Sequence, residues 1–301
     1  MKQFLIFTIK TITILLILAV ILDYCYTSIY LKSSKRNKIE YVYNSKARNY
    51  DVVILGSSRA NNHFVTEMFE QKGLKTFNYG MSGGHLFETS LMLKLMLERN
   101  YKIKTLILEA DLNLSNEKRS ETVAAKFFPY IHNSETIKNH FVNEEDFKYI
   151  YYLPFYRYIN FDALIGFREA YKTLSKQPTN VLDKGGFHAL GNKKGNMKND
   201  IRALKPLKNK YYEEIKKLCI ANNINFIAVM TPMCKNTKGI DYFDKVKKSY
   251  PEIYNYENVV VEDKFFSSCG HMNNSGARMF TARIINDFFN SQSKTKSSFQ
   301  R

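Results

Sequence analysis

Five short apolar segments, separated by stretches with helical periodicity, constrain the fold of this chain most. They are DVVILG, KTFNYG, TLILEA, NFIAVMT and NVVVED, at 51–56, 75–80, 105–110, 225–231 and 258–263. Continuous rather than alternating apolar residues are typical of strands that are buried on both faces, as in parallel sheets. The sequence therefore predicts an α/β fold with a five-stranded parallel sheet.

Four helical patterns lie between or after these segments. They cover 64–73, 85–100, 205–223 and 274–290, and the first ends in a glycine suited to a helix stop. Alternation of strands and helices implies a parallel sheet with helices on both faces. With 301 residues, of which 45% are hydrophobic, the chain can bury one large core. We expect this domain to span 51–290.

A long interval between the third and fourth strand segments interrupts this pattern. It covers roughly 114–204 and is rich in Tyr, Phe and Lys. A structureless connection of that length is unusual, so we predict a helical insertion that covers the open edge of the sheet, with most of its aromatic residues in the core. Within it, the Gly- and Lys-rich stretch 183–196 reads as a mobile surface loop. The tail at 291–301 reads as disordered.

The N-terminal segment 1–31 is long and apolar enough to cross a membrane. Its stretch 11–22 has no charged residue, and Lys10 lies near one end, where its side chain can reach the headgroups. No small-residue cleavage site follows, so an uncleaved signal anchor is favoured over a removed signal peptide. The polar, basic segment 32–50 is interpreted as a linker between this anchor and the domain.

The orientation of the anchor is ambiguous from charge alone. More Lys and Arg residues follow the apolar stretch than precede it, which by charge counting places the domain inside the cell. N-terminal anchors with a short leader nonetheless often export the domain that follows them.

The net charge of +17 comes from basic residues spread along the whole chain. This pattern favours solvated lysines over a binding surface for a polyanion, and no nucleic-acid-binding motif is present. Of the four cysteines, Cys234 and Cys269 each follow a strand end and are able to pair in an oxidising compartment. No C-x-x-C zinc spacing and no nucleotide-binding glycine motif occur, so no metal or cofactor is expected.

The first strand segment ends in Gly-Ser-Ser-Arg, at 56–59. In parallel α/β sheets, ligands bind beyond the carboxyl ends of the strands, so Ser57 and Ser58 fall at a position suited to a nucleophile. A serine that opens a helix also has backbone N–H groups beside it, which can stabilise an oxyanion. The alternative is an ordinary helix N-cap.

Three other strand ends place polar residues at the same edge. Gly83 lies in a glycine-rich turn after the second strand, Asn113 follows the third strand, and His271 precedes the last helix. The glycine allows close approach of the backbone to a ligand, and the asparagine amide can donate to an anion. Each also has a structural interpretation, as a tight turn, a helix cap and a loop histidine.

Together the four stretches resemble the SGNH (GDSL-like) hydrolase superfamily. The resemblance covers 51–120 and 205–290 and implies a three-layer, flavodoxin-like fold. It implies that Ser58 is the nucleophile and His271 the base. It also implies that Ser58, Gly83 and Asn113 form the oxyanion hole.

This chain departs from the family pattern at two positions. The family usually has Asp three residues before the histidine, where this chain has Ser268. Three outcomes are open: another carboxylate replaces it, with Asp263, Glu262 and Asp111 as candidates; a backbone carbonyl orients the histidine of a Ser–His dyad; or the enzyme is weak or inactive. The residue before the nucleophile is Ser57 instead of Asp, as in membrane-anchored relatives. Arg59 is expected either to hold an acidic group of the substrate or to form a surface salt bridge.

The resemblance implies a serine acyl-esterase or O-acyltransferase that acts on acylated cell-envelope glycan, without a cofactor. Membrane-anchored relatives with this layout include D-alanyl transfer and polysaccharide O-acetylation proteins of the bacterial envelope. By this resemblance the domain is extracytoplasmic, and its partners are the membrane, an envelope polysaccharide or acyl carrier, and a multi-span acyltransferase. The alternative is a catalytically inactive SGNH-like subunit that binds glycan or acts as a scaffold.

Overall fold

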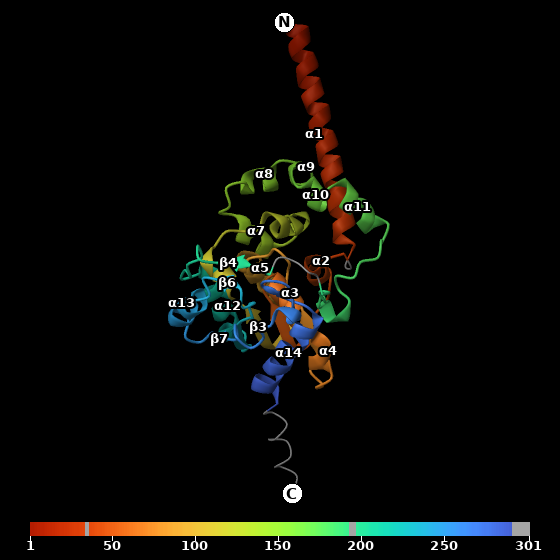
Figure 1. Cartoon of the computed structure of the whole chain (residues 1–301). Helices are drawn as coiled ribbons and strands as arrows, with labels where there is room; N and C mark the ends of the chain where they lie inside the picture. The colour runs from red at the N-terminus through yellow and green to blue at the C-terminus, as the bar shows by residue number, and fades with distance from the viewer. Residues whose placement is uncertain (34–35, 193–196, 291–301) are drawn as a thin grey trace.

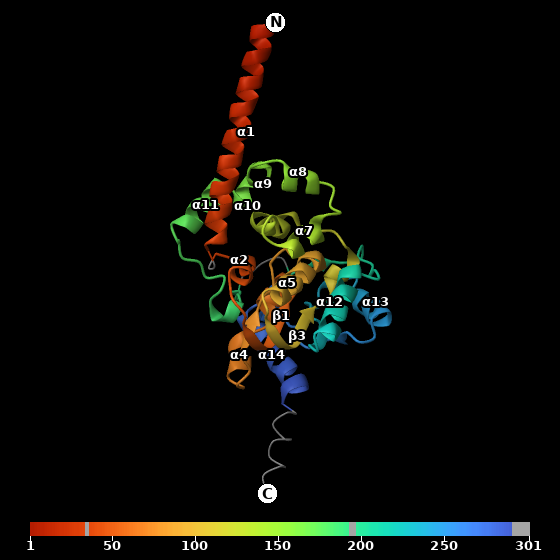
Figure 2. The ribbon, with the colours of Figure 1, turned by 180° about the vertical axis from the view of Figure 1, so that it is seen from behind.

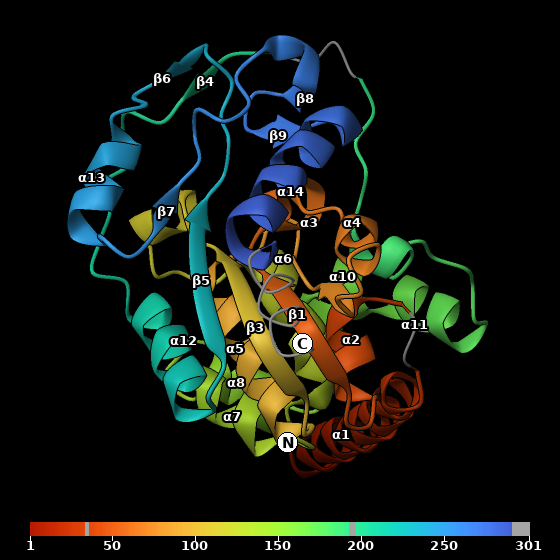
Figure 3. The same ribbon diagram turned by 90° about the horizontal axis from the view of Figure 1, so that it is seen from below.

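A five-stranded parallel sheet forms the centre of the computed structural model, which describes residues 1–33, 36–192 and 197–290. Across the sheet the strands are β2 (Thr76–Asn78), β1 (Asn49–Leu55), β3 (Lys102–Glu109), β5 (Asn225–Met230) and β7 (Tyr254–Asn255) (Figure 3). The chain reverses its direction of travel across the sheet between β1 and β3, which is the point where doubly wound α/β proteins bind ligands.

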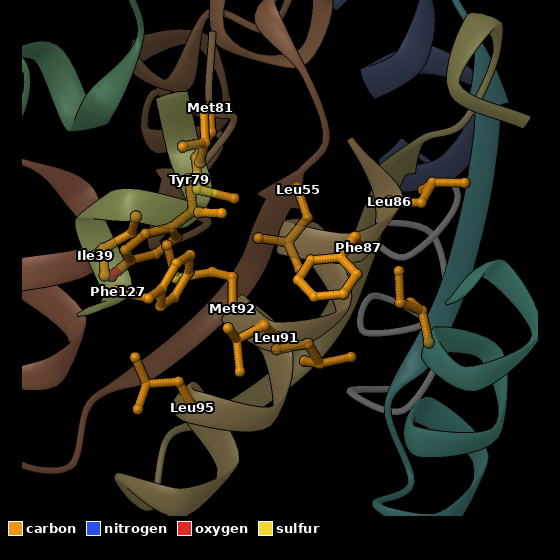
Figure 4. Packing of buried hydrophobic residues seen from close by; sticks show 14 of the residues in the cluster. Ile39, Leu55, Tyr79, Met81, Leu86, Phe87, Leu91, Met92, Leu95 and Phe127 are labelled. Atoms are coloured by element: carbon orange, nitrogen blue, oxygen red, sulfur yellow. The ribbon is translucent and has the colours of Figure 1, made fainter. Parts of the chain in front are cut away.

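Helices cover both faces of the sheet because alternate residues of each strand point to opposite faces. On one face Val53, Leu55 and Leu106 join a large apolar cluster with α5 (Leu86–Glu98) and α12 (Lys210–Ala221) (Figure 4). On the other face Val52 and Ile54 pack in a second cluster with residues of three helices: α3 (Ser58–His63), α4 (Thr66–Glu70) and α14 (Asn274–Phe289). The predicted α/β architecture with a parallel sheet is confirmed.

Four of the five predicted strands are confirmed, and the fifth is wrong. The segment 258–263 is a turn, and the edge position is taken by β7 a few residues earlier. The N–H of Tyr256 donates to Met230, and the chain then turns back, with Val259 donating to Tyr256. Val260 is buried in the second cluster without forming a ladder. An apolar run alone therefore did not distinguish a strand from a turn that buries one residue.

The interval 114–204 is largely helical, as predicted, and its element η3 (Lys184–Gly186) packs on the edge strand β2. Its helical elements are η1 (Leu112–Ser115), α6 (Glu121–Ala124), η2 (Ala125–Tyr130), α7 (Glu135–Phe141), α8 (Phe147–Tyr152), α9 (Tyr156–Asn160), α10 (Asp162–Ile165), α11 (Phe167–Leu174) and η3 (Lys184–Gly186). The α7 helix packs on α5, and η2 packs against both the N-terminal helix and the short helix α2 (Lys38–Tyr43). Many of its aromatic side chains are in the core, including Phe127, Phe128, Tyr130 and Phe141.

The N-terminal helix α1 (Lys2–Leu31) projects from the domain on the side of this insertion (Figures 1 and 2). Among the described residues it is the one helix long and apolar enough to span a membrane. Its C-terminal end is fixed to the insertion by an ion pair of 2.7 Å between Asp23 and Arg157. The Tyr30 hydroxyl donates to the Ile165 carbonyl over 2.8 Å. The helix is therefore held to the domain by side-chain contacts as well as by the chain.

The predicted linker and loop are partly ordered against the domain. Within 32–50, α2 buries Ile39 and Val42 in the core, because its apolar side chains face α5 and η2. Within 183–196, η3 packs on β2, whereas residues 193–196 lie outside the described residues, as does the predicted disordered tail at 291–301.

The remaining elements surround the carboxyl edge of the sheet. They are β4 (Asn199–Asp200), β6 (Thr237–Lys238), α13 (Tyr242–Ser249), η4 (Asp263–Phe265), β8 (Phe266–Ser268) and β9 (His271–Met272). A disulfide joins Cys234, after β5, to Cys269, in the turn between β8 and β9. The predicted pairing is confirmed, and it ties the β8–β9 hairpin to the end of the central sheet.

We expect the double substitution Cys234→Ala and Cys269→Ala to lower the free energy of unfolding by about 3 kcal/mol, because the disulfide closes a long loop in the unfolded chain. The loop is long because the two cysteines are 35 positions apart. Urea unfolding of the full chain in detergent measures the change. Cys25→Ala, at a free and exposed cysteine, is the control. Equal free energies of unfolding for the double variant and for Cys25→Ala would contradict the expectation.

Candidate active site

Ser58 and His271 come together at the carboxyl edge of the sheet. The Ser58 Oγ lies 2.8 Å from Nε2 of His271, although the residues are 213 positions apart in the chain. Ser58 opens α3 directly after β1, and His271 begins β9. Both side chains are partly exposed, so a substrate can reach them. The structure thus brings together the two residues that the motifs selected as nucleophile and base.

Ser57, not Ser58, is the N-cap of α3. Its Oγ accepts a hydrogen bond from the N–H of Arg59 and donates to Oε2 of Glu109 over 2.7 Å. Gly56 has φ +141°, and a Cβ at this position would lie 2.8 Å from the same Glu109 oxygen. A glycine is therefore required before the cap. Because Ser57 takes the capping role, the Ser58 hydroxyl is left to contact His271.

The hairpin of β8 and β9 supplies the group beside the second ring nitrogen of His271. Ser268 is paired with His271 across the hairpin, and its Oγ lies 3.5 Å from Nδ1, at the outer limit of a hydrogen bond. Asp111 and Asp263, the other candidates for a third triad member, are hydrogen-bonded elsewhere, to Thr231 and Asn236. Glu262 pairs with a lysine. Among the described residues, no carboxylate is hydrogen-bonded to His271.

Arg59 is buried rather than displayed to a substrate. Its Nε donates to Oδ2 of Asp111 over 2.9 Å, with the two side chains 4% and 0% exposed. Its two terminal nitrogens donate to the carbonyls of Gly270, Thr231 and Pro232. The expected surface salt bridge is thus a buried one. We assign Arg59 to the framework of the site, because its donors are occupied inside the protein.

The electrostatics of the site favour a neutral His271. Burial, and after it the nearby Arg59 guanidinium, lower the pKa of His271 below its usual value, against an opposing effect of Asp111. Burial and the neighbouring Asp111 raise the pKa of Glu109 to about 8. Burial acts to raise the pKa of Asp111, but the Arg59 charge and the hydrogen bonds to this carboxyl together lower it. The imidazole is therefore unprotonated at neutral pH, as a general base must be.

Gly83 and Asn113 lie at the same rim as Ser58. Gly83 has φ +78°, in the left-handed region that favours glycine, and its turn is exposed. The Asn113 amide lies 3.5 Å from the carbonyl of Gly84. The glycine turn is held beside the start of α3, because the N–H of Met81 donates to the carbonyl of Gly56. The Asn113 amide thus lies beside the glycine turn, and the glycine turn lies beside the loop that carries the nucleophile.

Two buried residues of this region were not singled out from the sequence. Glu109 underlies the serine turn, and its signal was a carboxylate in an otherwise apolar strand segment. His63 is fully buried; its Nε2 accepts from the N–H of Met272, and its Nδ1 lies 3.1 Å from Oγ1 of Thr231. Burial lowers the pKa of His63 well below its usual value. This neutral ring fixes the strand that carries His271.

Within the described residues, no group of three or more His, Cys, Asp or Glu side chains is arranged to hold a metal ion.

We expect the Ser58–His271 pair to keep its activity at neutral pH and to lose it only as the pH falls below 6.5, since His271 must be neutral to accept a proton. In Ser268→Asp, a carboxylate beside Nδ1 favours the imidazolium. The acid limb of kcat/KM should therefore move to higher pH, with kcat/KM about tenfold higher at pH 8. The pH profile of ester hydrolysis measures both effects. Ser268→Asn is the uncharged control, and the same shift in this variant would contradict the account.

Comparison with known proteins leaves the family of this chain open. No family model matches it, and no curated protein matches it. The likeness to SGNH hydrolases therefore depends on the four short motifs and on their positions at the strand ends.

Proposed function

We propose that this protein performs serine acyl-ester chemistry, with Ser58 as the nucleophile and His271 as the base. The observation that supports this most is the 2.8 Å contact between Ser58 Oγ and Nε2 of His271. A serine hydroxyl beside a neutral imidazole at the edge of a parallel sheet is the arrangement of nucleophile and base used in covalent acyl transfer.

The proposed reaction has two halves. Nε2 of His271 takes the hydroxyl proton while Ser58 Oγ forms a bond to the ester carbonyl carbon. The resulting oxyanion is stabilised by the N–H groups of Ser58 and Gly83 and the amide of Asn113. The bond to the leaving oxygen then breaks, and the imidazolium returns its proton to that oxygen. Water or a sugar hydroxyl next attacks the acyl-serine with His271 again as base, which gives hydrolysis or transfer.

The proposed substrate is an O-acylated glycan or acyl carrier of the cell envelope. This proposal follows the resemblance to membrane-anchored SGNH proteins. By the same resemblance we propose that the domain has a flavodoxin-like fold and that its partner is a multi-span acyltransferase. The apolar helix α1 supports attachment to a membrane. The Cys234–Cys269 disulfide supports an oxidising, extracytoplasmic location for the domain.

A second candidate function follows from the environment of His271. Its Nδ1 faces a serine hydroxyl at 3.5 Å rather than a carboxylate. Loss of the carboxylate of a Ser-His-Asp triad lowers kcat by about 10⁴. A domain of this kind that no longer turns over ester would be a glycan-binding or scaffold subunit.

Turnover of 4-nitrophenyl acetate by the full chain in detergent distinguishes the two functions. Ser58→Ala and His271→Ala should each lower kcat by at least about 100-fold, because the nucleophile or its base is lost. Ser275→Ala, at an exposed serine of α14, is the matched control and should leave the rate unchanged. Equal rates for all four proteins would exclude the catalytic function and leave the binding subunit.

A further inference from the structure

A cavity of about 260 Å³ adjoins the candidate active site. One wall includes Asn61, one helical turn after Ser58 on α3, and another includes Gly80 and Ser82, which precede Gly83. The amide of Asn61 donates to Ser82 Oγ over 3.1 Å, so the two walls are in contact. A group bound here would lie beside both the nucleophile loop and the glycine turn.

The lining of this cavity contains basic side chains and no acidic one among the described residues. It includes Lys38, Lys126 and His188. Lys38 is buried, which lowers its pKa to about 7, and its Nζ donates to Asn61, Gly80 and Gly186. Lys126 is partly buried, which lowers its pKa, and no hydrogen bond or ion pair joins its ammonium to the described residues. Glu169 acts electrostatically on Lys126 from outside this lining. A cation that has no hydrogen-bonded acidic partner within the described lining favours an anionic ligand.

A larger groove of about 940 Å³ lies next to this cavity. Arg36 lines the groove, whereas the following residues Asn37 and Lys38 line the cavity. On the opposite side Thr179 and Leu182 line the groove, and the residues between them line the cavity. The two spaces therefore share walls built from the same two segments of chain.

The groove lies where α1 enters the domain. Its apolar lining includes Ile29 of α1, Leu174 of α11 and Leu182. Its charged lining is made of Lys32, Lys176, Asp183 and Arg36, the last of which is ion-paired with Glu169. Apolar surface rimmed by Lys and Arg at the end of a membrane-spanning helix suits an acyl chain and an anionic headgroup.

The face around α1 has the character of a surface that contacts a bilayer. Helices α8 to α11 surround α1 on this side (Figures 1 and 2) and carry large apolar side chains that are more than half exposed: Tyr149, Tyr152, Ile159, Phe167, Tyr171 and Leu174. Ile159 and Leu153 face Leu15 and Leu16 of α1, within its apolar stretch. Tyrosines and aliphatic residues at this level are typical of the membrane interface. The groove is lined by Ser28, Ile29 and Lys32, at the C-terminal end of α1, on this same side of the domain.

We propose that groove and cavity together bind one membrane-anchored anionic substrate. Its acyl chains extend from the bilayer into the groove, and its anionic head lies in the cavity, beside Lys126 and within reach of Ser58. This inference deepens the function proposed above and depends on it for the role of Ser58, but the binding itself does not require turnover.

Lipid retention tests the binding directly. The full chain is reconstituted in nanodiscs of equimolar phosphatidylglycerol and phosphatidylcholine. After release of the chain from the nanodisc, native mass spectrometry measures which lipids stay bound to it. We expect one phosphatidylglycerol per chain, retained at least about fivefold over phosphatidylcholine. Lys126→Gln should lower this retention about tenfold, since one charged hydrogen-bond partner is lost, whereas Lys126→Arg, which keeps the cation, should restore it. Lys217→Gln, at an exposed lysine of α12, is the control.

Three results would overturn the inference. The first is equal retention of the two lipids, and the second is an unchanged ratio of retained phosphatidylglycerol to phosphatidylcholine in Lys126→Gln. The third is complete displacement of the lipid by the same concentration of water-soluble glycerophosphoglycerol, which would show a site for a free anion. Ser58→Ala should retain the lipid fully. Lipid retention without turnover of 4-nitrophenyl acetate would therefore contradict the proposed function but not the binding site, and turnover without lipid retention would contradict the binding site alone.

Discussion

The buried Arg59 guanidinium is the interaction on which the candidate site depends. Arg59 directly follows Ser58, and it donates to the carbonyl of Gly270, which directly precedes His271. It also donates to Asp111, after β3, and to Thr231, after β5. One side chain thus joins the loops that follow three strands of the sheet to the hairpin that carries the base. Without Asp111 the buried cation would be costly, so the ion pair and the loop geometry stabilise each other.

The same cation has a second effect, on protonation. It lowers the pKa of His271 and of Asp111, so that it favours a neutral base and an ionised framework carboxylate. A Ser-His-Asp triad instead places a carboxylate on the histidine, which stabilises the imidazolium formed during the reaction. Here the Ser268 hydroxyl stands in the position of that carboxylate, with its Oγ 3.5 Å from Nδ1 of His271. The site therefore favours the start of proton transfer more than the charged intermediate, which is consistent with a slow esterase or a transferase.

The sequence was sufficient to predict the parts of the structure that depend on local pattern. Ser58, Gly83 and Asn113 follow β1, β2 and β3, so they lie at one edge, where the carboxyl ends of parallel strands meet. His271 instead reaches Ser58 on the antiparallel β8–β9 hairpin, which the sequence did not predict. Properties that depend on packing were not predictable. Of the valine run 259–261 only Val260 is buried, and the run forms no strand. Arg59 reads as a surface residue, although loops that are distant in the chain enclose it. The position of the insertion around α1 also depends on contacts between remote segments, such as that of Asp23 with Arg157.

The central claim is that Ser58, and not its neighbour, is a nucleophile activated by His271. The most direct measurement is labelling of the full chain with a fluorophosphonate, followed by trypsin digestion and fragmentation of the peptide 49–59, NYDVVILGSSR. The account predicts one phosphonyl group on Ser58, formed in the wild-type protein and absent from His271→Ala. An adduct on Ser57, or no adduct under conditions that label a known serine esterase, would contradict it.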